Sequence, residues 1–280
     1  MHNVRKVIQL SSDYLEKRGI SNPRRQAEEL LAALLKKKRI ELYFDYDAPL
    51  EERELETFRE WIKRRGEKEP IGYILGEVPF LNLKLKVSRK VLIPRQESEI
   101  LAAYILKRLP GRELKIWDLC TGSGCLGLSI KAARPESSVS LSDLSLEALE
   151  IARFNAAQNQ LDVEIFQGDL LEPFSGKRTD VLICNPPYVE SKAYETLEDE
   201  VRLYEPKLAL VGGESFYRRL HQELPDFLNP GAQIFFEIGE KQKEALDRLF
   251  SEPHWKAKHF EPDWAGLDRF FFLEYHPDSK

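Results

Sequence analysis

A glycine-rich stretch, DLCTGSG at residues 118–124, has the composition of a ligand-binding turn. Gly122 and Gly124 let the backbone turn tightly and approach a ligand with no Cβ in the way. A helix that begins directly after such a turn presents unpaired amide groups to the ligand. The stretch therefore predicts a binding loop between a strand and a helix.

The acids around this loop indicate which ligand it binds. Gly122, Gly124 and Gly127 have the spacing G-x-G-x-x-G, which also occurs in dinucleotide-binding folds. Asp143 follows about twenty residues later, where an acid accepts hydrogen bonds from ribose hydroxyls in either class of cofactor. Asp118, before the glycines, favours a cofactor with a cationic aminoacyl end, such as S-adenosylmethionine (AdoMet). The alternative is a plain strand-to-helix turn in which Asp143 caps the next helix.

A second stretch, CNPPYVE at residues 184–190, stops an apolar segment with two prolines. Pro186 and Pro187 have a fixed φ and no N–H, so they stiffen the turn and leave carbonyl oxygens without competing local donors. Asn185 adds a side-chain oxygen acceptor and Tyr188 adds a flat ring. Such acceptors suit a planar group that carries an NH₂, which they would orient toward an electrophilic carbon. The expected reaction is methylation of that nitrogen by AdoMet, and the alternative is a rigid loop without chemistry.

Both loops need a sheet to position them, and the pattern from residue 114 onward predicts one. Short apolar segments alternate with helical ones, as in LKIWDL, CLGLSIKAA, SVSLSD and LEALEIARFNAAQ. This order implies an α/β fold with a parallel sheet and helices on both faces. The last two segments, WKAKHFEP and RFFFLEYH, indicate an antiparallel edge. The loops would lie at the carboxyl ends of strands, where open α/β sheets bind ligands.

The chain before this sheet has two further parts. Residues 1–69 show helical periodicity, as in AEELLAALLKKK, and predict a small helical domain. The segment GYILGEVPFLNLKLKVSRKVLIP changes to the alternation of strands, and it places four apolar side chains on one side, those of Leu81, Leu83, Leu85 and Val87. We therefore expect a small helical domain at 1–69, a β-hairpin linker at 70–93 and the domain with the parallel sheet at 94–280.

Composition and charge limit the classes of function. The 280-residue chain has a net charge of −5, and residues 1–69 contain 16 basic and 14 acidic side chains. The remainder is therefore about −7, which argues against a catalytic face that grips a polyanion. Three cysteines and five histidines without C-x-x-C or H-x-x-x-H spacing support neither a zinc site nor a disulfide framework. No apolar run reaches the ~18 residues of a membrane span, so we expect a cytoplasmic protein.

With both loops placed, the chain resembles the protein-(glutamine-N5) methyltransferases that modify peptide chain release factors, the HemK/PrmC type. The resemblance covers nearly the whole chain through EPIGYILGEVPF, VLIPRQESE, DLCTGSG, GDL, NPPYV, EVRLYEPKLALVGG, EIGEKQ and DWAGLDR, in this order. NPPY is shared with amino-methyltransferases of adenine and guanine, so IGYILGE and DWAGLDR point to this family. The resemblance implies a Rossmann-like class I methyltransferase fold, with a mostly parallel seven-stranded sheet after a small all-α domain and a β-hairpin. It also implies that residues 1–69 recognise the substrate and that residues 94–280 are the AdoMet-dependent methyltransferase domain.

The resemblance also implies a substrate and its contacts. The substrate is the side-chain amide of the glutamine in the Gly-Gly-Gln loop of class I release factors, whose methylation supports translation termination. Neither a membrane nor a nucleic acid is expected as a partner. The amide would be held and methylated at Asn185, Pro186, Pro187 and Tyr188. The AdoMet site would be formed by Asp118, Cys120, Thr121, Gly122, Ser123, Gly124, Asp143, Leu170 and Asn185.

The chain departs from the family pattern at a few positions. Cys120 stands where the family usually has glycine, and Gln96 stands where it has a second proline. The segment after Gly213 is shorter than the usual GG-x-D-G-L. We interpret Cys120 and Cys184, at the ends of neighbouring strands, as packing residues. The changed proline leaves three residues of the same segment as secondary candidates, namely Arg95, Glu97 and Glu99.

Other functions stay open at this point. A methyltransferase acting on amino groups of adenine or guanine in nucleic acid would use the same NPPY loop, but the acidic carboxyl-terminal part of the chain argues against it. A nicotinamide-dependent oxidoreductase is supported by the glycine spacing and Asp143. A non-catalytic binding module with the same fold is the last alternative.

Overall fold

The computed structural model describes residues 3–277, which its contacts divide into two compact units. The first unit runs to Gly76 and also contains Glu198–Tyr204, and the second unit contains the intervening and following residues. Among residues 3–277, no helix is long and apolar enough to cross a membrane.

The first unit is built from helices around one apolar core. Its elements are α1 (Val4–Lys17), α2 (Pro23–Leu34), the 3₁₀ helix η1 (Arg39–Tyr43), α3 (Glu52–Gly66), α4 (Ile71–Leu75) and α9 (Asp199–Tyr204). α1 begins where the Asn3 side chain accepts a hydrogen bond from Lys6 N at 3.0 Å. α9 is attached by an ion pair between Arg65 and Glu200 at 2.6 Å. The helical domain expected from the periodicity is therefore present.

The segment after residue 69 corrects one expectation. Residues 71–75 form helix α4 instead of a strand, and Ile74 is buried in the core of the helical unit. Gly76 then adopts a left-handed φ of 78°, which ends this helix before the hairpin. The two units thus divide at Gly76 and not at residue 69. Leu81 also differs, because it lies in the hairpin turn at φ 49° and is 44% exposed.

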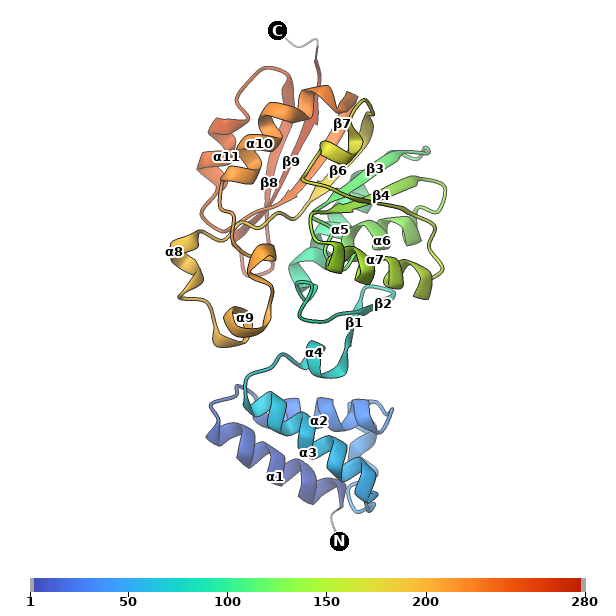
Figure 1. The fold of residues 1–280 in the computed structure, drawn as a ribbon, viewed down its shortest axis with the longest axis vertical. Helices are drawn as coiled ribbons and strands as arrows, with labels where there is room; N and C mark the ends of the chain where they lie inside the picture. The colour runs from blue at the N-terminus through green and yellow to red at the C-terminus, as the bar shows by residue number, and fades with distance from the viewer. Residues whose placement is uncertain (1–2, 278–280) are drawn as a thin grey trace. The chain divides into compact units, whose positions relative to one another are not determined.

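The second unit contains the hairpin and a seven-stranded sheet (Figure 1). The hairpin pairs β1 (Glu77–Phe80) with β2 (Leu83–Lys86). The sheet has the order β5-β4-β3-β6-β7-β9-β8, and β9 runs antiparallel to both of its neighbours. This confirms the mostly parallel sheet and its antiparallel edge. The strands are β3 (Lys115–Leu119), β4 (Ser138–Asp143), β5 (Glu164–Gln167), β6 (Thr179–Cys184), β7 (Leu228–Glu237), β8 (Trp255–Pro262) and β9 (Asp268–Tyr275).

Helices cover both faces of the sheet, because its central strands are apolar on both sides. One core packs α5 (Gln96–Arg108), α6 (Cys125–Ala133) and α7 (Leu146–Gln158) against strand residues such as Ile116 and Ile183. The other packs α10 (Ser215–Glu223) and α11 (Lys243–Leu249) against alternate residues such as Trp117 and Phe236. The connections contain η2 (Glu172–Phe174), α8 (Ser191–Tyr194), η3 (Lys207–Ala209) and η4 (Leu224–Asp226).

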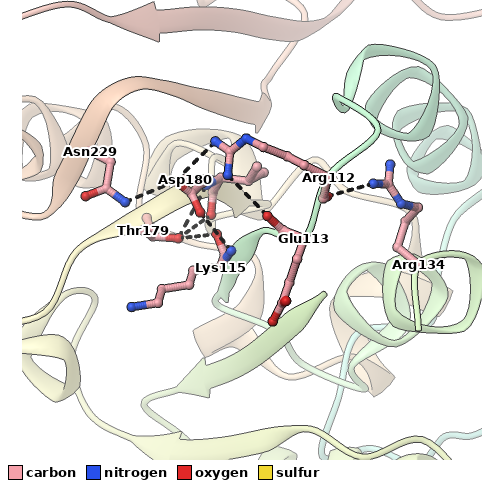
Figure 2. Close-up of polar contacts among 8 residues, drawn as sticks. Arg112, Glu113, Lys115, Arg134, Thr179, Asp180 and Asn229 are labelled. Carbon is pink, nitrogen blue, oxygen red and sulfur yellow. Dashed lines mark hydrogen bonds and ion pairs between the residues drawn. The ribbon is translucent and has the colours of Figure 1, made fainter. Parts of the chain in front are cut away.

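Polar contacts fasten the amino-terminal edge of the sheet (Figure 2). The Asp180 carboxylate at the start of β6 accepts from Lys115 N at 2.9 Å and from Asn229 Nδ2 at 3.0 Å. These contacts tie β3, β6 and β7 together and fix their register. In that register Leu119 pairs with Cys184, which pairs with Phe236. The residues that follow at the opposite edge, such as Asn185, are therefore brought close together.

Candidate active site

A cavity of about 380 Å³ lies at the carboxyl edge of the parallel strands. Its volume is within the range of small-molecule sites, and its position is that of ligand sites in open α/β sheets. Of the residues expected from the sequence, Gly124, Pro186 and Tyr188 are not part of its lining. The expected residues that do line it are Asp118, Cys120, Thr121, Gly122, Ser123, Asp143, Leu170, Asn185 and Pro187.

The glycine loop makes the turn that its composition predicted. Gly122 and Gly124 have left-handed φ angles of 55° and 85°, and Gly124 is the N-cap of α6. Gly127 is required for close packing, since a Cβ there would lie 2.2 Å from Leu141 Cδ2. The third glycine therefore serves the contact of α6 with β4, and the first two shape the loop.

Asp118 is buried beneath this loop and braces it. Its Oδ2 accepts from Thr121 Oγ1 at 2.6 Å and from Gly127 N at 2.9 Å. Burial raises the pKa of this carboxyl to about 7, although both hydrogen bonds act in the opposite direction. Asp118 therefore has a structural task in addition to its place in the cavity lining.

Asp143 lies at the end of β4 and binds two backbone amides. Its Oδ2 accepts from Gly122 N and its Oδ1 from Ser145 N, both at 2.9 Å. Burial raises the pKa of Asp143 against these hydrogen bonds. The cap of α7 is the Ser145 side chain, which accepts from Ala148 N at 3.2 Å. Asp143 thus links the glycine loop to the start of α7, and capping alone does not account for it.

Two non-glycine residues of the cavity have left-handed backbones. Cys120 has φ 54° and Leu170 has φ 51°. A glycine at position 120, as in the family pattern, would adopt this conformation without a steric cost. Burial and the neighbouring Cys120 thiol raise the pKa of the Cys184 thiol. Both belong to an apolar cluster, in agreement with their interpretation as packing residues.

Two other segments hold the NPPY loop in place. Val189 N donates to Leu210 O at 2.9 Å, and Gly212 N donates to Val189 O at 3.1 Å. A Cβ on Gly212 would lie 2.4 Å from Pro187 O, so only glycine permits this approach. From the other side, Gln242 Nε2 donates to Tyr188 O at 3.4 Å. Motifs distant in sequence, EVRLYEPKLALVGG and EIGEKQ, thus support the same loop.

Glu237, the last residue of β7, is a site residue that the sequence reasoning missed. It is 2% exposed, and its Oε2 accepts from Ser98 Oγ at 2.7 Å. The Tyr188 hydroxyl lies 3.5 Å from its Oε1, and the neighbouring Asn185 side chain lowers its pKa. Burial raises the pKa of Glu237 to about 6. Its place at the end of the strand beside NPPY was the available signal, because neighbouring strand ends meet at one edge.

Two of the three secondary candidates, Arg95 and Glu99, have structural partners. Arg95 lines the cavity and forms an ion pair with Glu205, a buried carboxylate that also accepts from Ile93 N at 3.3 Å. Glu99 Oε1 accepts from Leu81 N at 2.8 Å and so fastens the hairpin turn.

The cavity has the size and side chains to hold AdoMet. Asp118 and Asp143 would supply acidic groups for its cationic and ribose parts, and the amino terminus of α6 would add backbone amides. Leu144 and Leu170 line the cavity and would supply apolar surface for a flat base.

The chain is similar to known methyltransferases over nearly its whole length. Residues 6–76 match the family described as PrmC N-terminal domain, and residues 96–203 match the family described as Methyltransferase small domain. A protein of Chlamydia trachomatis serovar D named release factor glutamine methyltransferase is 41% identical over 277 residues, which cover 97% of this chain and 94% of that protein. A Geobacter sulfurreducens protein with the same name is 36% identical, covering 95% and 94%.

Solved structures support the fold. A crystal structure of a methyltransferase from Pyrococcus furiosus aligns with a TM-score of 0.53 and 20% identity, and covers 70% of this chain and 89% of that one. At this identity the likeness concerns the class I methyltransferase fold alone.

Proposed function

The chain belongs to the release factor glutamine methyltransferase family, and we propose that it methylates the side-chain amide of the glutamine in the Gly-Gly-Gln loop of a class I release factor. Its cofactor is AdoMet. The observation that carries the proposal is the position of Asn185, which lines the cavity directly after β6, beside the buried Glu237 at the end of β7.

The chemistry of a carboxamide explains why the loop needs acceptors. The nitrogen lone pair is delocalised into the carbonyl group, so the nitrogen is a weak nucleophile. The Asn185 side-chain oxygen and a carbonyl of the proline pair would accept its two N–H bonds and turn the nitrogen toward the cofactor. The Tyr188 ring would cover the planar amide. Bound AdoMet supplies an electrophilic methyl group on a sulfonium.

The loop can hold this geometry because it is stiff. Pro186 and Pro187 are both buried, and hydrogen bonds to Leu210 and Gln242 fasten the two residues that follow them. A preorganised set of acceptors does not have to be ordered when the substrate binds. The nitrogen becomes acidic once it is alkylated and can lose its proton afterwards, so no residue is assigned as a general base.

The partner and the location follow from the same proposal. We expect a class I release factor to be the protein substrate, and the helical unit to take part in recognising it. The near-neutral charge of residues 1–69 fits a protein partner better than a nucleic acid. Translation factors act in the cytoplasm, which is where we expect this enzyme.

Transfer of a labelled methyl group tests the proposal directly. The purified protein, AdoMet labelled on the methyl group and a class I release factor should give a labelled factor. Changing the glutamine of its Gly-Gly-Gln loop to alanine should remove the label. DNA and ribosomal RNA serve as parallel substrates, because NPPY also occurs in nucleic-acid methyltransferases. Labelling of either nucleic acid, with an unlabelled release factor, would refute the proposal.

A further inference from the structure

Asn185 can act as an acceptor only if its side-chain amide has one of two orientations. The oxygen must face the substrate NH₂, because the Asn185 nitrogen would present donors to donors. A flip about the last side-chain bond exchanges the two atoms with little change in shape. Some neighbouring group must therefore select the productive orientation.

Glu237 is placed to make that selection. Its strand, β7, pairs with β6, and Phe236 lies beside Cys184. Glu237 is the residue after Phe236, and Asn185 is the residue after Cys184, so the two are next to each other at the end of the paired strands. The Glu237 side chain is buried, and the neighbouring Asn185 side chain lowers its pKa. An ionised carboxylate only accepts hydrogen bonds, so the Asn185 NH₂ must face it. The Asn185 oxygen is then turned away from Glu237.

We propose that Glu237 is a positioning residue for the methyl acceptor, which holds the Asn185 amide with its oxygen toward the substrate nitrogen. The inference rests on the proposed function, since it specifies how the NPPY loop is kept ready for a carboxamide. Glu237 acts through Asn185 and does not touch the reacting atoms.

The contacts around Glu237 keep its carboxylate in place. Ser98 Oγ on α5 donates to Oε2 at 2.7 Å. Arg269 on β9 donates from Nη1 to Ile238 O at 3.3 Å, and its Nε lies 3.4 Å from Asp263 Oδ2. Its charge favours the ionised form of Glu237. The motif DWAGLDR contains both Asp263 and Arg269, and through the charge of Arg269 it favours the ionised Glu237 beside the NPPY loop.

The charge state of Glu237 decides what it offers to Asn185. Burial raises its pKa to about 6, while Ser98 and Arg269 lower it. A protonated Glu237 gains an O–H donor that competes for the Asn185 oxygen. Turnover should therefore fall as the pH drops below about 6. Other titratable groups with an electrostatic effect on Glu237, or affected by it, come from the surrounding elements: Glu97, Cys125, Tyr188, Tyr217 and Arg269.

The first test is a pH profile of single-turnover methyl transfer with Glu237→Gln. A glutamine has the same shape but can offer either an oxygen or an NH₂ to Asn185. We expect the transfer rate of this variant at neutral pH to be about 10- to 100-fold lower than that of the wild type. The acidic limb of the profile, which is the fall in rate of the wild type below about pH 6, should be absent in the variant. The AdoMet dissociation constant, measured by calorimetry, should stay within about twofold. Glu274→Gln, which removes a carboxylate elsewhere on the β7–β9 pair, is the matched control and should keep the wild-type profile.

Ser98→Ala adds a variant that keeps the carboxylate. Because the Ser98 hydrogen bond lowers the pKa of Glu237, its loss should move the acidic limb to higher pH. Protonation of Asp118 can be told apart from that of Glu237 by the AdoMet dissociation constant. Asp118 lies under the glycine loop, so its titration would change AdoMet binding. A limb that stays in place in Ser98→Ala and persists in Glu237→Gln would overturn the proposal.

The second test needs neither cofactor nor substrate. In protein labelled with ¹⁵N at asparagine, the side-chain NH₂ signal of Asn185 is assigned from its absence in Asn185→Ala. We expect this signal to titrate with a midpoint near pH 6 in the wild type and to stay constant in Glu237→Gln. A signal independent of pH between about pH 5 and pH 8 in the wild type would contradict the inference. Failure of the proposed function would show separately, as no methyl transfer by the wild-type protein.

Discussion

Cys120 illustrates how much a single residue can be constrained at this site. It follows β3, lines the cavity and has φ 54°, a conformation that costs a residue with a Cβ about 1–2 kcal/mol. The family usually has glycine at this position, and the left-handed φ of residue 120 explains why glycine is favoured there. The thiol partly offsets the cost because it packs in the apolar cluster with Cys184.

We predict that Cys120→Gly is more stable than Cys120→Ala by about 1 kcal/mol. Both variants remove the thiol and its packing, and only glycine also removes the steric cost of the left-handed backbone. The free energy of unfolding from urea titrations measures the difference. Equal stability, or a more stable alanine variant, would show that the strain argument is wrong.

At the scale of elements, the start of α5 holds together several parts of the site. The helix begins at Gln96 after Arg95, whose φ of −101° and ψ of 158° are extended. Ser98 in the first turn binds Glu237, and Glu99 binds the hairpin turn. The first helical position has no intrahelical partner for its N–H, so the family's proline fits there.

We therefore predict that Gln96→Pro raises the free energy of unfolding by about 0.4–1 kcal/mol. The extended backbone of Arg95 is the conformation that a residue before proline prefers, and the exposed Gln96 side chain leaves room for the ring. Gln96→Ala controls for loss of the glutamine side chain. A lower unfolding free energy for the proline variant than for the alanine variant would contradict the prediction.

At the scale of the whole molecule, segments far apart in sequence meet at one edge of the sheet and bury carboxylates there. Asp118 and Glu237 are at most 2% exposed, and burial raises the pKa of each, to about 7 and about 6. An acid with a raised pKa in the folded state favours folding while it is protonated. That contribution is present below its ordinary pKa and is lost as the pH rises through the folded value.

This sign gives a prediction for stability. Between about pH 5 and pH 8, the free energy of unfolding of Glu237→Gln should fall about 1 kcal/mol less than that of the wild type, because a glutamine does not ionise. Urea titrations at the two pH values measure this difference, and Glu274→Gln should behave like the wild type. A larger loss in Glu237→Gln than in the wild type would reverse the predicted sign.

The sequence predicted the sheet and both loops well, because each depends on a local pattern. Alternating apolar segments located the strands, and Gly122 and Gly124 located the turn. The helix at 71–75 was missed, since its apolar residues face the core of the helical unit and their spacing is equally compatible with a strand. Glu237 was missed because its importance comes from the pairing of β6 with β7, which a local pattern does not contain.

The most direct test of the account separates cofactor binding from methyl transfer in Asn185→Ala. If Asn185 mainly holds the acceptor amide, single-turnover methylation of the release factor should fall at least about 100-fold, while the AdoMet dissociation constant changes only a few-fold. Asp143→Ala, measured in parallel, should instead weaken AdoMet binding. Retention of most of the transfer rate in Asn185→Ala would contradict the central claim that this side chain positions the glutamine amide.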